Sequence, residues 1–583
     1  MDRTCTVCRQ NFTISDRDRA YYDQIQVPAP TKCPNCRLIR RLHERNTKKP
    51  YYRTCSFSGK KILSQYAAEV PFPVYEGEVW WSDQWDPLSY GRDFDFNRPF
   101  FEQFKELKNT VPHLALFNTI GTLENSEFNT CTAYLKNCYL LAESDYCEDC
   151  YYSNLLKHSQ NCIDCSICYE DEVCYECIDC QKCYRLFYSQ DCMSCQDSYF
   201  LKNCHNVTDS IGCINIRRGQ YLIFNKQYSK EDYENMKVDF KLDTHQGIDA
   251  LKKKTEEFFS TQPQQHLIEE HNENSFGDHL FNSKNAWYCF DSKDLEDCTY
   301  CFRVSLGVKS SMDYTSWGDK AELVYESSSC GDHVYNLKFC TMCWTNCQNL
   351  TYCDGCFSSS DLFGCVGVRR KKYCILNKQY SKEDYELLMP KIIEHMRKTG
   401  EYGEFFPQDV APLAYNESLV MDCFPLEKEQ ALALGYRWKD EPLIDHTSDH
   451  LICESCGKNY AFIEQELAFY KTHNLPPPLK CFACRHRTRV ANRTMPAIYE
   501  YPCSRCSELM YTGYQPDSGL TILCKKCYLQ EVYGSANTGT KQLKSLITSV
   551  SNCTRSNQGY NYLITKSLGE TKNNEKTIEC WDL

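Results

Sequence analysis

Long apolar runs are missing from this sequence: no stretch of eighteen apolar residues occurs, so we expect no membrane-spanning helix. The opening residues, MDRTCTVCRQ, lack the apolar segment of a secretory signal, which predicts a cytoplasmic protein. No G-x-S-x-G, P-loop or G-x-G-x-x-G motif stands in a credible context. We therefore expect a protein that is not an enzyme and has no membrane partner.

An excess of positive charge is also missing, because the formal net charge of the 583 residues is −12. This excludes a uniformly basic nucleic-acid-binding protein, although a local basic surface stays open. Charged residues make up 25% and hydrophobic residues 42%, which fits a folded chain of several domains.

Cysteine, in contrast, is abundant, with 42 residues, many of them in C-x-x-C pairs. In a long chain without a visible secretory signal, this number favours thiolate metal sites and reduced thiols over disulfides. Three sets of paired knuckles have the spacing of closed tetrahedral zinc sites. The predicted ligands are Cys5, Cys8, Cys33 and Cys36; Cys453, Cys456, Cys481 and Cys484; and Cys503, Cys506, Cys524 and Cys527.

The two ends of the chain are copies related by a numbering offset of 448, which maps Cys5 onto Cys453 and Cys55 onto Cys503. A fourth site is not expected, because Ser58 replaces Cys506 and the remaining ligands fall near Tyr75 and Glu78 after a slip of one residue. The sequence therefore predicts about three Zn²⁺ ions per chain. The degenerate ribbon is expected to be held by an aromatic cluster of Trp80, Trp81, Trp85, Phe94 and Phe96.

The pattern C-x-x-C, an aromatic residue, then P-x-K-C-x-x-C-R resembles the probable zinc-ribbon family found in many bacterial proteins. The match covers about forty residues at each end and includes CPNCR at Cys33–Arg37 and CFACR at Cys481–Arg485. The resemblance implies a metal and a small fold, and it implies no activity.

Basic residues follow both ribbons, and residues 1–60 hold 13 Lys and Arg against 5 Asp and Glu. Such a cluster suits phosphate contacts, so we expect a nucleic acid or a nucleoprotein as partner. A solvated helix face or a protein partner is the alternative. The candidate residues are Arg37, Arg40, Arg41, Arg45, Arg485, Arg487, Arg489 and Arg493.

The middle of the chain repeats with a period of fifteen, and a finer period of three places small or apolar residues from Cys138 to Cys213, with Asp171 as the one exception. Neither a helix nor an alternating strand explains a period of three. We interpret each 15-residue unit as one coil of a narrow β-solenoid with an interior of small side chains. The aligned cysteines predict a thiol ladder of Cys147, Cys150, Cys162, Cys165, Cys177, Cys180, Cys192 and Cys195, beside an outward ladder of Tyr169, Tyr184 and Tyr199.

A second, more eroded copy follows, and both copies end in the same ten residues from Asn225 and from Asn377. Ser229 and Ser381 are expected to begin helices that cap the open ends of the solenoids. The 26 cysteines of the two copies have three interpretations: buried packing, zinc or iron–sulfur ligation between coils, and disulfides. His266 with His271, and His446 with His450, are expected to be surface residues.

The predicted fold is mostly β, with terminal zinc ribbons, two narrow cysteine-lined β-solenoids, helical caps and a linker. The predicted boundaries are a zinc ribbon at 1–46, a degenerate ribbon at 47–117, a solenoid at 118–224, a cap and linker at 225–275, a second solenoid at 276–376, a cap and linker at 377–450, zinc ribbons at 451–495 and 496–534, and a polar tail at 535–583. The predicted function is a non-enzymatic zinc-binding scaffold for nucleic acid or a nucleoprotein. The alternatives are a protein-interaction scaffold that uses the solenoid faces, and a thiol-rich protein for metal storage or sensing.

Overall fold

The computed structural model describes residues 1–47, 49–440 and 451–534. The chain forms two units, Met1–Tyr528 and Leu529–Leu583. The segments predicted as separate ribbons and solenoids lie in the first, apart from the last residues of the ribbon predicted at 496–534. Of the second unit, the π-helix η3 (Leu529–Tyr533) is described. The polar tail at 535–583 and the His446–His450 pair lie outside the described residues. No helix in the described part is both long and apolar enough to cross a membrane.

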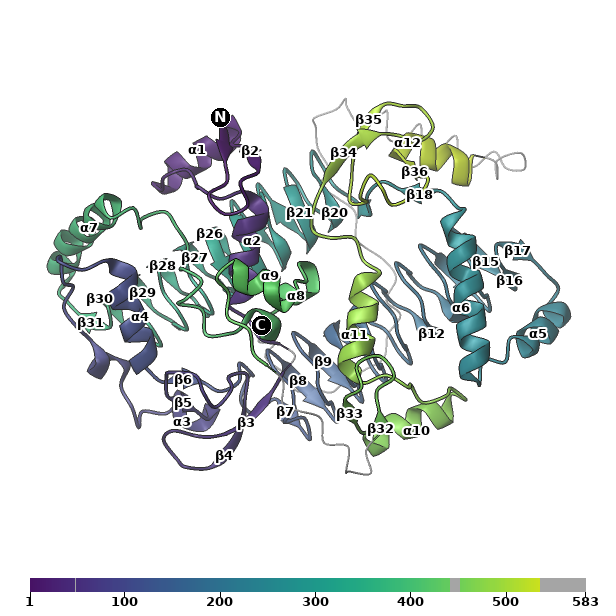
Figure 1. Cartoon of the computed structure of the whole chain (residues 1–583), viewed down its shortest axis with the longest axis horizontal. Coiled ribbons are helices and arrows are strands. Elements are labelled where there is room, and N and C mark those ends of the chain that lie inside the picture. The colour runs from purple at the N-terminus through teal and green to yellow at the C-terminus, as the bar shows by residue number, and fades with distance from the viewer. Residues whose placement is uncertain (48, 441–450, 535–583) are drawn as a thin grey trace, which may run out of the picture. The chain divides into compact units, whose positions relative to one another are not determined.

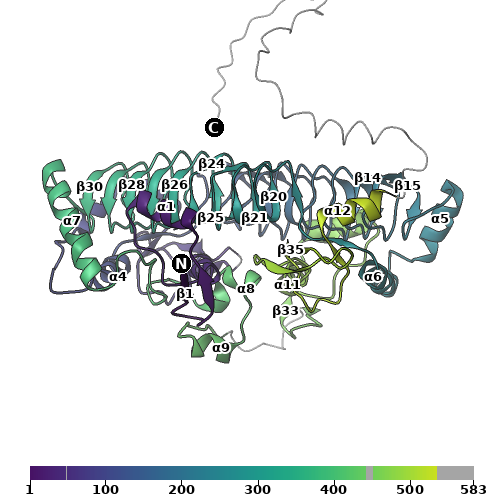
Figure 2. The same cartoon turned by 90° about the horizontal axis from the view of Figure 1, so that it is seen from above.

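Two stacks of strands form most of the first unit, and strands outnumber helices (Figures 1 and 2). The strands of each stack are parallel except at its end, where β17 and β31 pair antiparallel with the strand before them. The first stack (residues 123–227) contains β7 (Leu123–Glu124), β8 (Ala133–Lys136), β9 (Asp145–Glu148), β10 (Asn154–Lys157), β11 (Ser166–Tyr169), β12 (Tyr184–Phe187), β13 (Gln196–Tyr199), β14 (His205–Thr208), β15 (Arg217–Gln220), β16 (Leu222–Ile223) and β17 (Lys226–Gln227). The chain returns to the same face after twelve positions, as the pairs Leu156↔Cys168 and Leu186↔Ser198 show. The predicted 15-residue coil is therefore wrong.

The sequence period of fifteen equals one turn of twelve positions plus one triplet. Residues fifteen apart consequently lie on different faces of the stack and trace a diagonal, as Cys147, Cys162, Cys177 and Cys192 do. A true column joins residues one full turn apart, such as Cys150, Cys162 and Cys174. Four triplets per turn, not five, leave a narrow interior, which cysteine and serine fill together with leucine at intervals. The predicted tyrosine ladder fails for the same reason, because Tyr169, Tyr184 and Tyr199 occupy different columns.

A left-handed backbone conformation at every third residue bends the chain at each corner. From Asn137 to Asp209 each residue that precedes an inward side chain has a φ between 43° and 57°. This region costs most L-residues about 1 kcal/mol or more, and Asn and Asp tolerate it best. Many corner residues are accordingly Asn or Asp, among them Asn161, Asp164 and Asp179.

The second stack (residues 269–379) has wider coils in its middle. Its register lengthens to thirteen positions at Tyr314↔Ser327 and Leu337↔Leu350, and it returns to twelve at Leu362↔Cys374. The strands are β19 (Glu269–Glu270), β20 (Phe276–Phe281), β21 (Trp287–Lys293), β22 (Leu295–Glu296), β23 (Phe302–Ser305), β24 (Val308–Lys309), β25 (Met312–Gly318), β26 (Glu322–Ser328), β27 (Tyr335–Lys338), β28 (Gln348–Thr351), β29 (Ser360–Phe363), β30 (Lys372–Ile375) and β31 (Lys378–Gln379).

Helices follow both stacks, as expected. Helix α5 (Lys230–Asp239) begins after Ser229 and α7 (Lys382–Lys398) after Ser381, and each serine hydroxyl accepts the backbone N–H three residues on. Figure 1 shows α5 and α6 (His245–Ser260) beside the last strands of the first stack and α7 beside those of the second. These helices cover strand edges that would otherwise expose unpaired backbone groups.

The ends of the chain supply the remaining elements. The N-terminal part contains β1 (Asp2–Thr4), β2 (Asn11–Thr13), α1 (Asp16–Ile25), α2 (Pro34–His43), β3 (Tyr51–Thr54), β4 (Lys61–Ser64), β5 (Val74–Tyr75), α3 (Gly77–Trp81), η1 (Pro87–Tyr90), α4 (Phe100–Thr110) and β6 (His113–Leu114). Strand β18 (Gln264–Gln265) lies between the two stacks. The segment between the second stack and the C-terminal part contains η2 (Tyr415–Glu417), α8 (Val420–Cys423) and α9 (Lys428–Ala433). The C-terminal part contains β32 (Leu451–Ile452), β33 (Asn459–Tyr460), α10 (Glu464–Thr472), α11 (Phe482–Ala491), β34 (Tyr499–Pro502), β35 (Leu509–Thr512), β36 (Ile522–Leu523) and α12 (Lys525–Tyr528).

Candidate metal centres

Three groups of four cysteines converge at the positions that the spacing predicts. Site 1 is Cys5, Cys8, Cys33 and Cys36; site 2 is Cys453, Cys456, Cys481 and Cys484; site 3 is Cys503, Cys506, Cys524 and Cys527. In each group all four sulfur atoms lie within 4.8 Å of one another. The Sγ–Sγ distance is 3.6 Å for Cys8–Cys33 and 3.8 Å for Cys506–Cys524. A tetrahedral zinc with Zn–S bonds of about 2.3 Å places its sulfurs about 3.8 Å apart, so the geometry fits that ion.

The first half of each group is a tight turn after a short strand. The residue that follows the second cysteine is left-handed, as at Arg9, Gly457 and Ser507, and its N–H donates to the carbonyl of the first cysteine at 2.8–3.1 Å. This turn directs both sulfurs to the same side. It recurs at Gly59, in the hairpin that has only Cys55.

The second half of each group lies at the start of a helix. Cys33 is the N-cap of α2 and Cys481 the N-cap of α11, so one ligand sits where helical N–H groups are unpaired. Hydrogen bonding from Cys36 lowers the pKa of Cys33 to about 5. Burial would raise the pKa of Cys503, but N–H groups of the Cys506 and Cys524 turns lower it to about 6. Sites 1 and 3 therefore each have one thiol shifted toward the thiolate, the form that binds metal, whereas the pKa values of Cys36 and Cys527 are raised.

The cysteines of the two stacks have a different environment. Every described cysteine is a free thiol, which contradicts the disulfide interpretation. Among the described residues, no stack cysteine belongs to a group of three metal-ligating side chains within 4.8 Å, so the predicted thiol ladder does not form a zinc or iron–sulfur site. The eight predicted residues, Cys147, Cys150, Cys162, Cys165, Cys177, Cys180, Cys192 and Cys195, are all buried.

Hydrogen bonding explains why the interior contains cysteine and serine. The N–H of an inward residue points into the stack and needs an acceptor from the coil before it. Ser153 accepts the N–H of Cys165 at 2.9 Å, and the S–H of Cys165 donates to the carbonyl of Ile163 at 3.4 Å. Asp171, the exception in the period of three, accepts the N–H of Cys183 at 2.8 Å. An inward position therefore favours a small side chain that fills the core and also accepts a hydrogen bond from this N–H.

The arginines that follow site 1 are buried in ion pairs with the second stack. Arg37 is 1% exposed and Arg41 is 0% exposed. Both guanidiniums contact the buried carboxylate of Asp313, at 2.9 and 3.2 Å. Burial alone would lower the pKa of Arg37, but Asp313 raises it well above its usual value.

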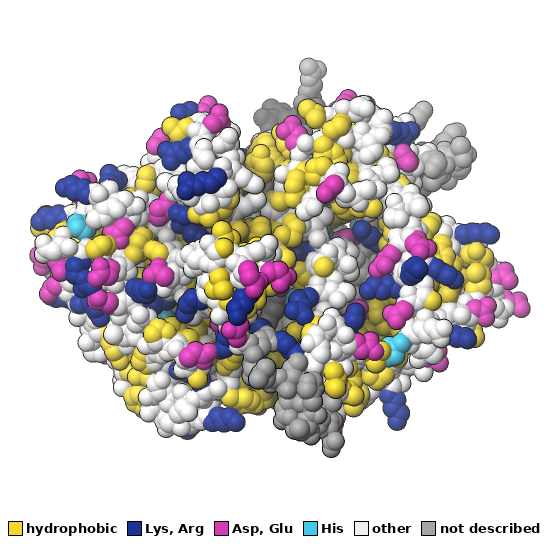
Figure 3. All heavy atoms as spheres, viewed as in Figure 1, with side chains coloured by type: hydrophobic (Ala, Val, Ile, Leu, Met, Phe, Trp, Pro, Cys, Tyr) yellow, Lys and Arg dark blue, Asp and Glu magenta, His cyan; other side chains and the backbone are white. Residues whose placement is uncertain are grey.

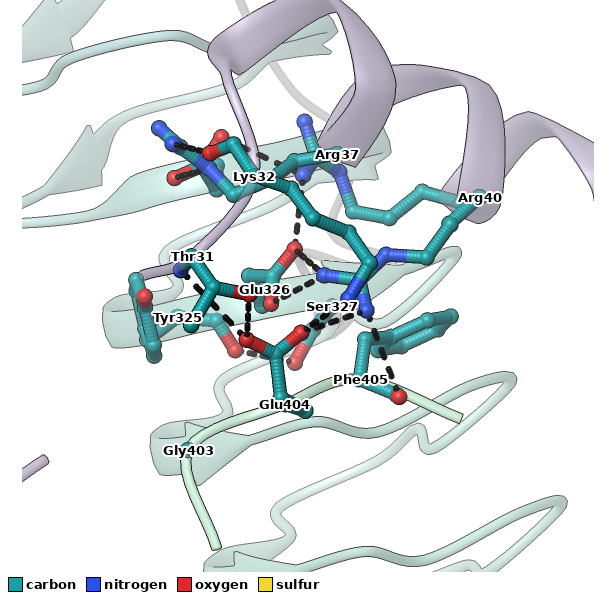
Figure 4. A network of polar contacts seen from close by, with 12 residues as sticks. Thr31, Lys32, Arg37, Arg40, Tyr325, Glu326, Ser327, Gly403, Glu404 and Phe405 are labelled. Atoms are coloured by element: carbon teal, nitrogen blue, oxygen red, sulfur yellow. Dashed lines mark hydrogen bonds and ion pairs between the residues drawn. The ribbon is translucent and has the colours of Figure 1, made fainter. Parts of the chain in front are cut away.

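A second carboxylate pair completes this contact (Figure 4). Arg40 donates to Glu326 at 3.1 Å and to Glu404 at 2.9 Å, and Lys32 contacts Glu404 at 2.6 Å. Burial would raise the pKa of Glu404, but Arg40 and Lys32 lower it to about 2. Arg45, further along, contacts Glu143 of the first stack at 2.6 Å.

The arginines that follow site 2 make the equivalent contacts with the first stack. Arg485 and Arg489 contact Asp164 at 2.7 and 2.9 Å. Arg493 contacts Asp179 at 2.8 Å and Asp291, from the second stack, at 2.5 Å. Arg487 is the exposed member of the eight predicted residues.

These contacts correct the assignment of the arginines to a nucleic-acid surface. Seven of the eight side chains would have to leave buried carboxylates to contact a phosphate, and an uncompensated buried charge costs several kcal/mol. Figure 3 shows basic and acidic side chains interspersed on the face drawn, without a continuous basic surface. The sequence did not indicate these pairs, because most of the carboxylates lie at corner positions of the stacks, far from the arginines along the chain.

The histidine pair His266 and His271 forms no metal-ligating group within the described ranges. The Nδ1 atom of His266 lies 2.8 Å from the carbonyl oxygen of Tyr511. A different group, Asp179, Asp191 and His279, does converge within 4.8 Å, and the sequence had not indicated it.

Comparisons with known proteins add little. No family model matches the chain, and no curated protein matches it. A solved structure described as a "putative acetyltransferase" from Desulfovibrio desulfuricans G20 is 10% identical, with 46% of this chain and 72% of that chain covered and a TM-score of 0.10. A likeness this weak carries no argument, so the resemblance to the zinc-ribbon family stays an expectation.

Proposed function

We propose that this chain is a non-enzymatic scaffold in which three structural zinc ions hold two β-solenoids together. The support is the closed four-cysteine geometry of sites 1 to 3 and the role of the neighbouring helices. Four thiolates leave no open position for a substrate, as in structural rather than catalytic zinc sites. Free thiols throughout the described residues favour a reducing compartment.

One observation carries the proposal: the metal ligands begin the helices that dock on the stacks. Arg37, Arg41 and Arg45 follow Cys33 by four, eight and twelve positions, and Arg485, Arg489 and Arg493 follow Cys481 by the same steps. Steps of four place Arg37 and Arg41 on one face of α2, and Arg485 and Arg489 on one face of α11. Arg45 and Arg493 follow two residues after the helix ends. A metal that orders each helix start therefore also presents the charges that neutralise the buried carboxylates of the stacks.

Metal content tests this proposal. Zinc that a thiol-blocking mercurial releases from the purified chain should amount to three equivalents, and Cys36→Ser should remove one of them. Cys131→Ser, a half-buried cysteine outside the three sites, is the control and should keep all three. If the mercurial releases no zinc, or if Cys36→Ser leaves the count unchanged, the proposal is wrong.

The docking step has its own test. Arg41→Ala and Arg489→Ala should each lower the free energy of unfolding by about 3 kcal/mol, because each takes away one of the two guanidiniums that pair with a buried carboxylate. Arg19, also in the N-terminal part, pairs with Asp16 at the surface, with side chains 52% and 90% exposed. Arg19→Ala should cost less than about 1 kcal/mol. Equal losses in urea unfolding for all three variants would contradict the docking role.

For the partner, we favour a protein over a nucleic acid, because the arginines that suggested a nucleic acid are occupied. The first stack presents an exposed aromatic column in which Tyr134, Tyr146 and His158 stack at 4.5 and 4.7 Å between ring centroids. A Tyr134→Ser, Tyr146→Ser double variant should lose a partner that wild type captures from nuclease-treated lysate. Tyr335→Ser, at an equally exposed site of the second stack, is the control. If the double variant captures the same partner as the wild type, the aromatic column is not the binding face.

A further inference from the structure

A second kind of ligand group lies where the two stacks meet, away from the cysteine sites. Asp179 and Asp191 are one turn of twelve positions apart, so they occupy the same corner column of the first stack on successive coils. His279 belongs to β20 of the second stack and faces them. Its Nε2 atom lies 2.9 Å from Asp191 Oδ1 and 3.7 Å from Asp179 Oδ2. Each of the three side chains is at most 8% exposed.

The neighbours of this group hold it in position. Arg493 donates to both oxygens of Asp179, at 2.8 and 3.1 Å. The Nδ1 atom of His279 lies 3.7 Å from Asp278, whose carboxylate accepts from the N–H of Ile268 at 2.8 Å and from the Thr494 hydroxyl at 2.5 Å. A carboxylate that faces the second ring nitrogen is the usual support for a histidine that binds metal through the first.

Charge in this region is unbalanced. Four carboxylates, those of Asp179, Asp191, Asp278 and Asp291, face the guanidiniums of Arg303 and Arg493 and the ammonium of Lys202. One negative charge remains, and a buried charge requires a partner. A proton on His279 would balance this charge, and a divalent cation bound to neutral His279 would more than offset it.

Space and an unused donor lie beside the group. A cavity of about 20 Å³, large enough for a water molecule, is lined by His279, Arg303 and Cys423 among others. Arg303 is 8% exposed, and its Nε and Nη1 atoms make no hydrogen bond but lie 3.6 Å from Asp291 and 3.9 Å from Glu143. His279 borders both this cavity and the two carboxylates, whereas Asp179 and Asp191 do not line the cavity. Three protein ligands leave a metal at least one open position for water.

We propose that Asp179, Asp191 and His279 form a fourth metal site, for a hard divalent first-row cation such as Mn²⁺. One imidazole and two carboxylates are harder donors than the four thiolates of sites 1 to 3, so the two classes of site select different ions. The cation bonds to the Nε2 lone pair and to one oxygen of each carboxylate, and the Nε2 proton leaves to solvent. The bound ion joins the first stack to the second, a link additional to the docked arginine helices.

The test counts metal on the full chain with its cysteine sites loaded with zinc. After equilibration with Mn²⁺, the wild type should hold one manganese in addition to three zinc ions. His279→Gln and Asp191→Asn should each lose the manganese and keep the zinc. Asp197→Asn, which removes a more exposed carboxylate of the first stack, is the control and should bind manganese as the wild type does.

Electron paramagnetic resonance of the wild type provides a second readout, which does not depend on the folding of any variant. Bound Mn²⁺ should show coupling to one nitrogen nucleus, whereas stoichiometric Mn²⁺ that gives only the free aqueous signal would overturn the proposal. A variant series in which His279→Gln binds manganese as the wild type does would also overturn it, and a proton on His279 would then be the partner of the carboxylates. Because the mercurial measures thiolate-bound zinc separately, failure of the three zinc sites and failure of this site give different results.

Discussion

Two hairpins of this chain have the same backbone and different means of support. The Cys503 hairpin (residues 499–512) and the Cys55 hairpin (residues 51–64) share one register at an offset of 448, with Tyr499↔Thr512 in one and Tyr51↔Ser64 in the other. The following short strands match too, since β36 begins at Ile522 and β5 at Val74. Of the two, the Cys503 hairpin alone has a four-cysteine group.

The matched contacts also correct the alignment of the lost ligands. Cys503 accepts the N–H of Cys524 at 3.3 Å, and Cys55 accepts the N–H of Glu76 at 3.4 Å. Glu76 therefore stands in place of Cys524 at the unchanged offset, and Val79 in place of Cys527. The predicted slip to Tyr75 and Glu78 is wrong.

An aromatic core stabilises the Cys55 hairpin region in place of metal. Trp80 is 2% exposed and packs against Trp81, Trp85 and Phe357, the last from the second stack. Arg369, also from the second stack, lies over the Trp80 ring at 5.0 Å. The comparison shows that a ribbon-like turn can fold without a metal site when a larger domain provides the apolar contacts that a small isolated domain lacks.

The largest expected effect comes from removing the metal of site 3. A Cys503→Ser, Cys506→Ser variant should lose one zinc and the hydrogen-exchange protection of residues 499–512, because a structural zinc contributes on the order of 10 kcal/mol to a small fold. Cys55→Ser should lose no zinc and keep residues 51–64 protected. Protection of residues 499–512 that survives loss of the metal would break the comparison.

Trp80→Ala should have the converse effect. Loss of a buried tryptophan costs about 3–5 kcal/mol, so protection of residues 51–64 should fall while all three zinc ions remain. The half-buried Trp81 is the matched position, and Trp81→Ala should cost less. A zinc count that falls with Trp80→Ala would show that the two hairpins are not independent.

Acid should weaken the Cys55 region through His113. Burial is the main cause that lowers the pKa of His113 to about 4, while the unfolded chain takes up the proton near 6.5. The contribution of neutral His113 to the free energy of unfolding is fully present above pH 6.5 and is lost as the pH falls to about 4. The loss is about 3 kcal/mol in total and about 1 kcal/mol between pH 7.5 and 5.5. Urea unfolding of His113→Gln should vary less with pH than that of the wild type. The exposed His333→Gln control should follow the wild type.

The smallest change in stability, and the sharpest test of the comparison, is reconstruction of the lost site. Ser58→Cys, Glu76→Cys and Val79→Cys together place three cysteines beside Cys55 at the positions of Cys506, Cys524 and Cys527. The triple variant should bind one zinc more than the parent chain. A variant without Val79→Cys keeps three of the four ligands and should bind this ion more weakly. An unchanged zinc count would show that the two backbones differ where the ligands meet.

Local sequence determined much of this protein. The C-x-x-C spacing specified all three four-cysteine groups, because a tight turn and a helix start place ligands through local geometry alone. The offset of 448 identified the hairpin without metal, and Ser229 and Ser381 marked the starts of the capping helices. The period of three indicated inward positions correctly, since each triplet has its own bend.

Only the tertiary structure decided the number of triplets in a turn and the partners of the arginines. A diagonal of cysteines and a column of cysteines look alike in a sequence, and hydrogen bonds between successive coils select the register of twelve. That register aligns Asp179 with Asp191, and the meeting of the two stacks adds His279. Charge along the chain likewise could not show that Arg37 and Arg489 face buried carboxylates, because Asp313 and Asp164 lie in the stacks, far from both arginines in the sequence. Neighbouring residues determine local geometry, whereas the pairing of distant charges depends on which surfaces the folded stacks bring together.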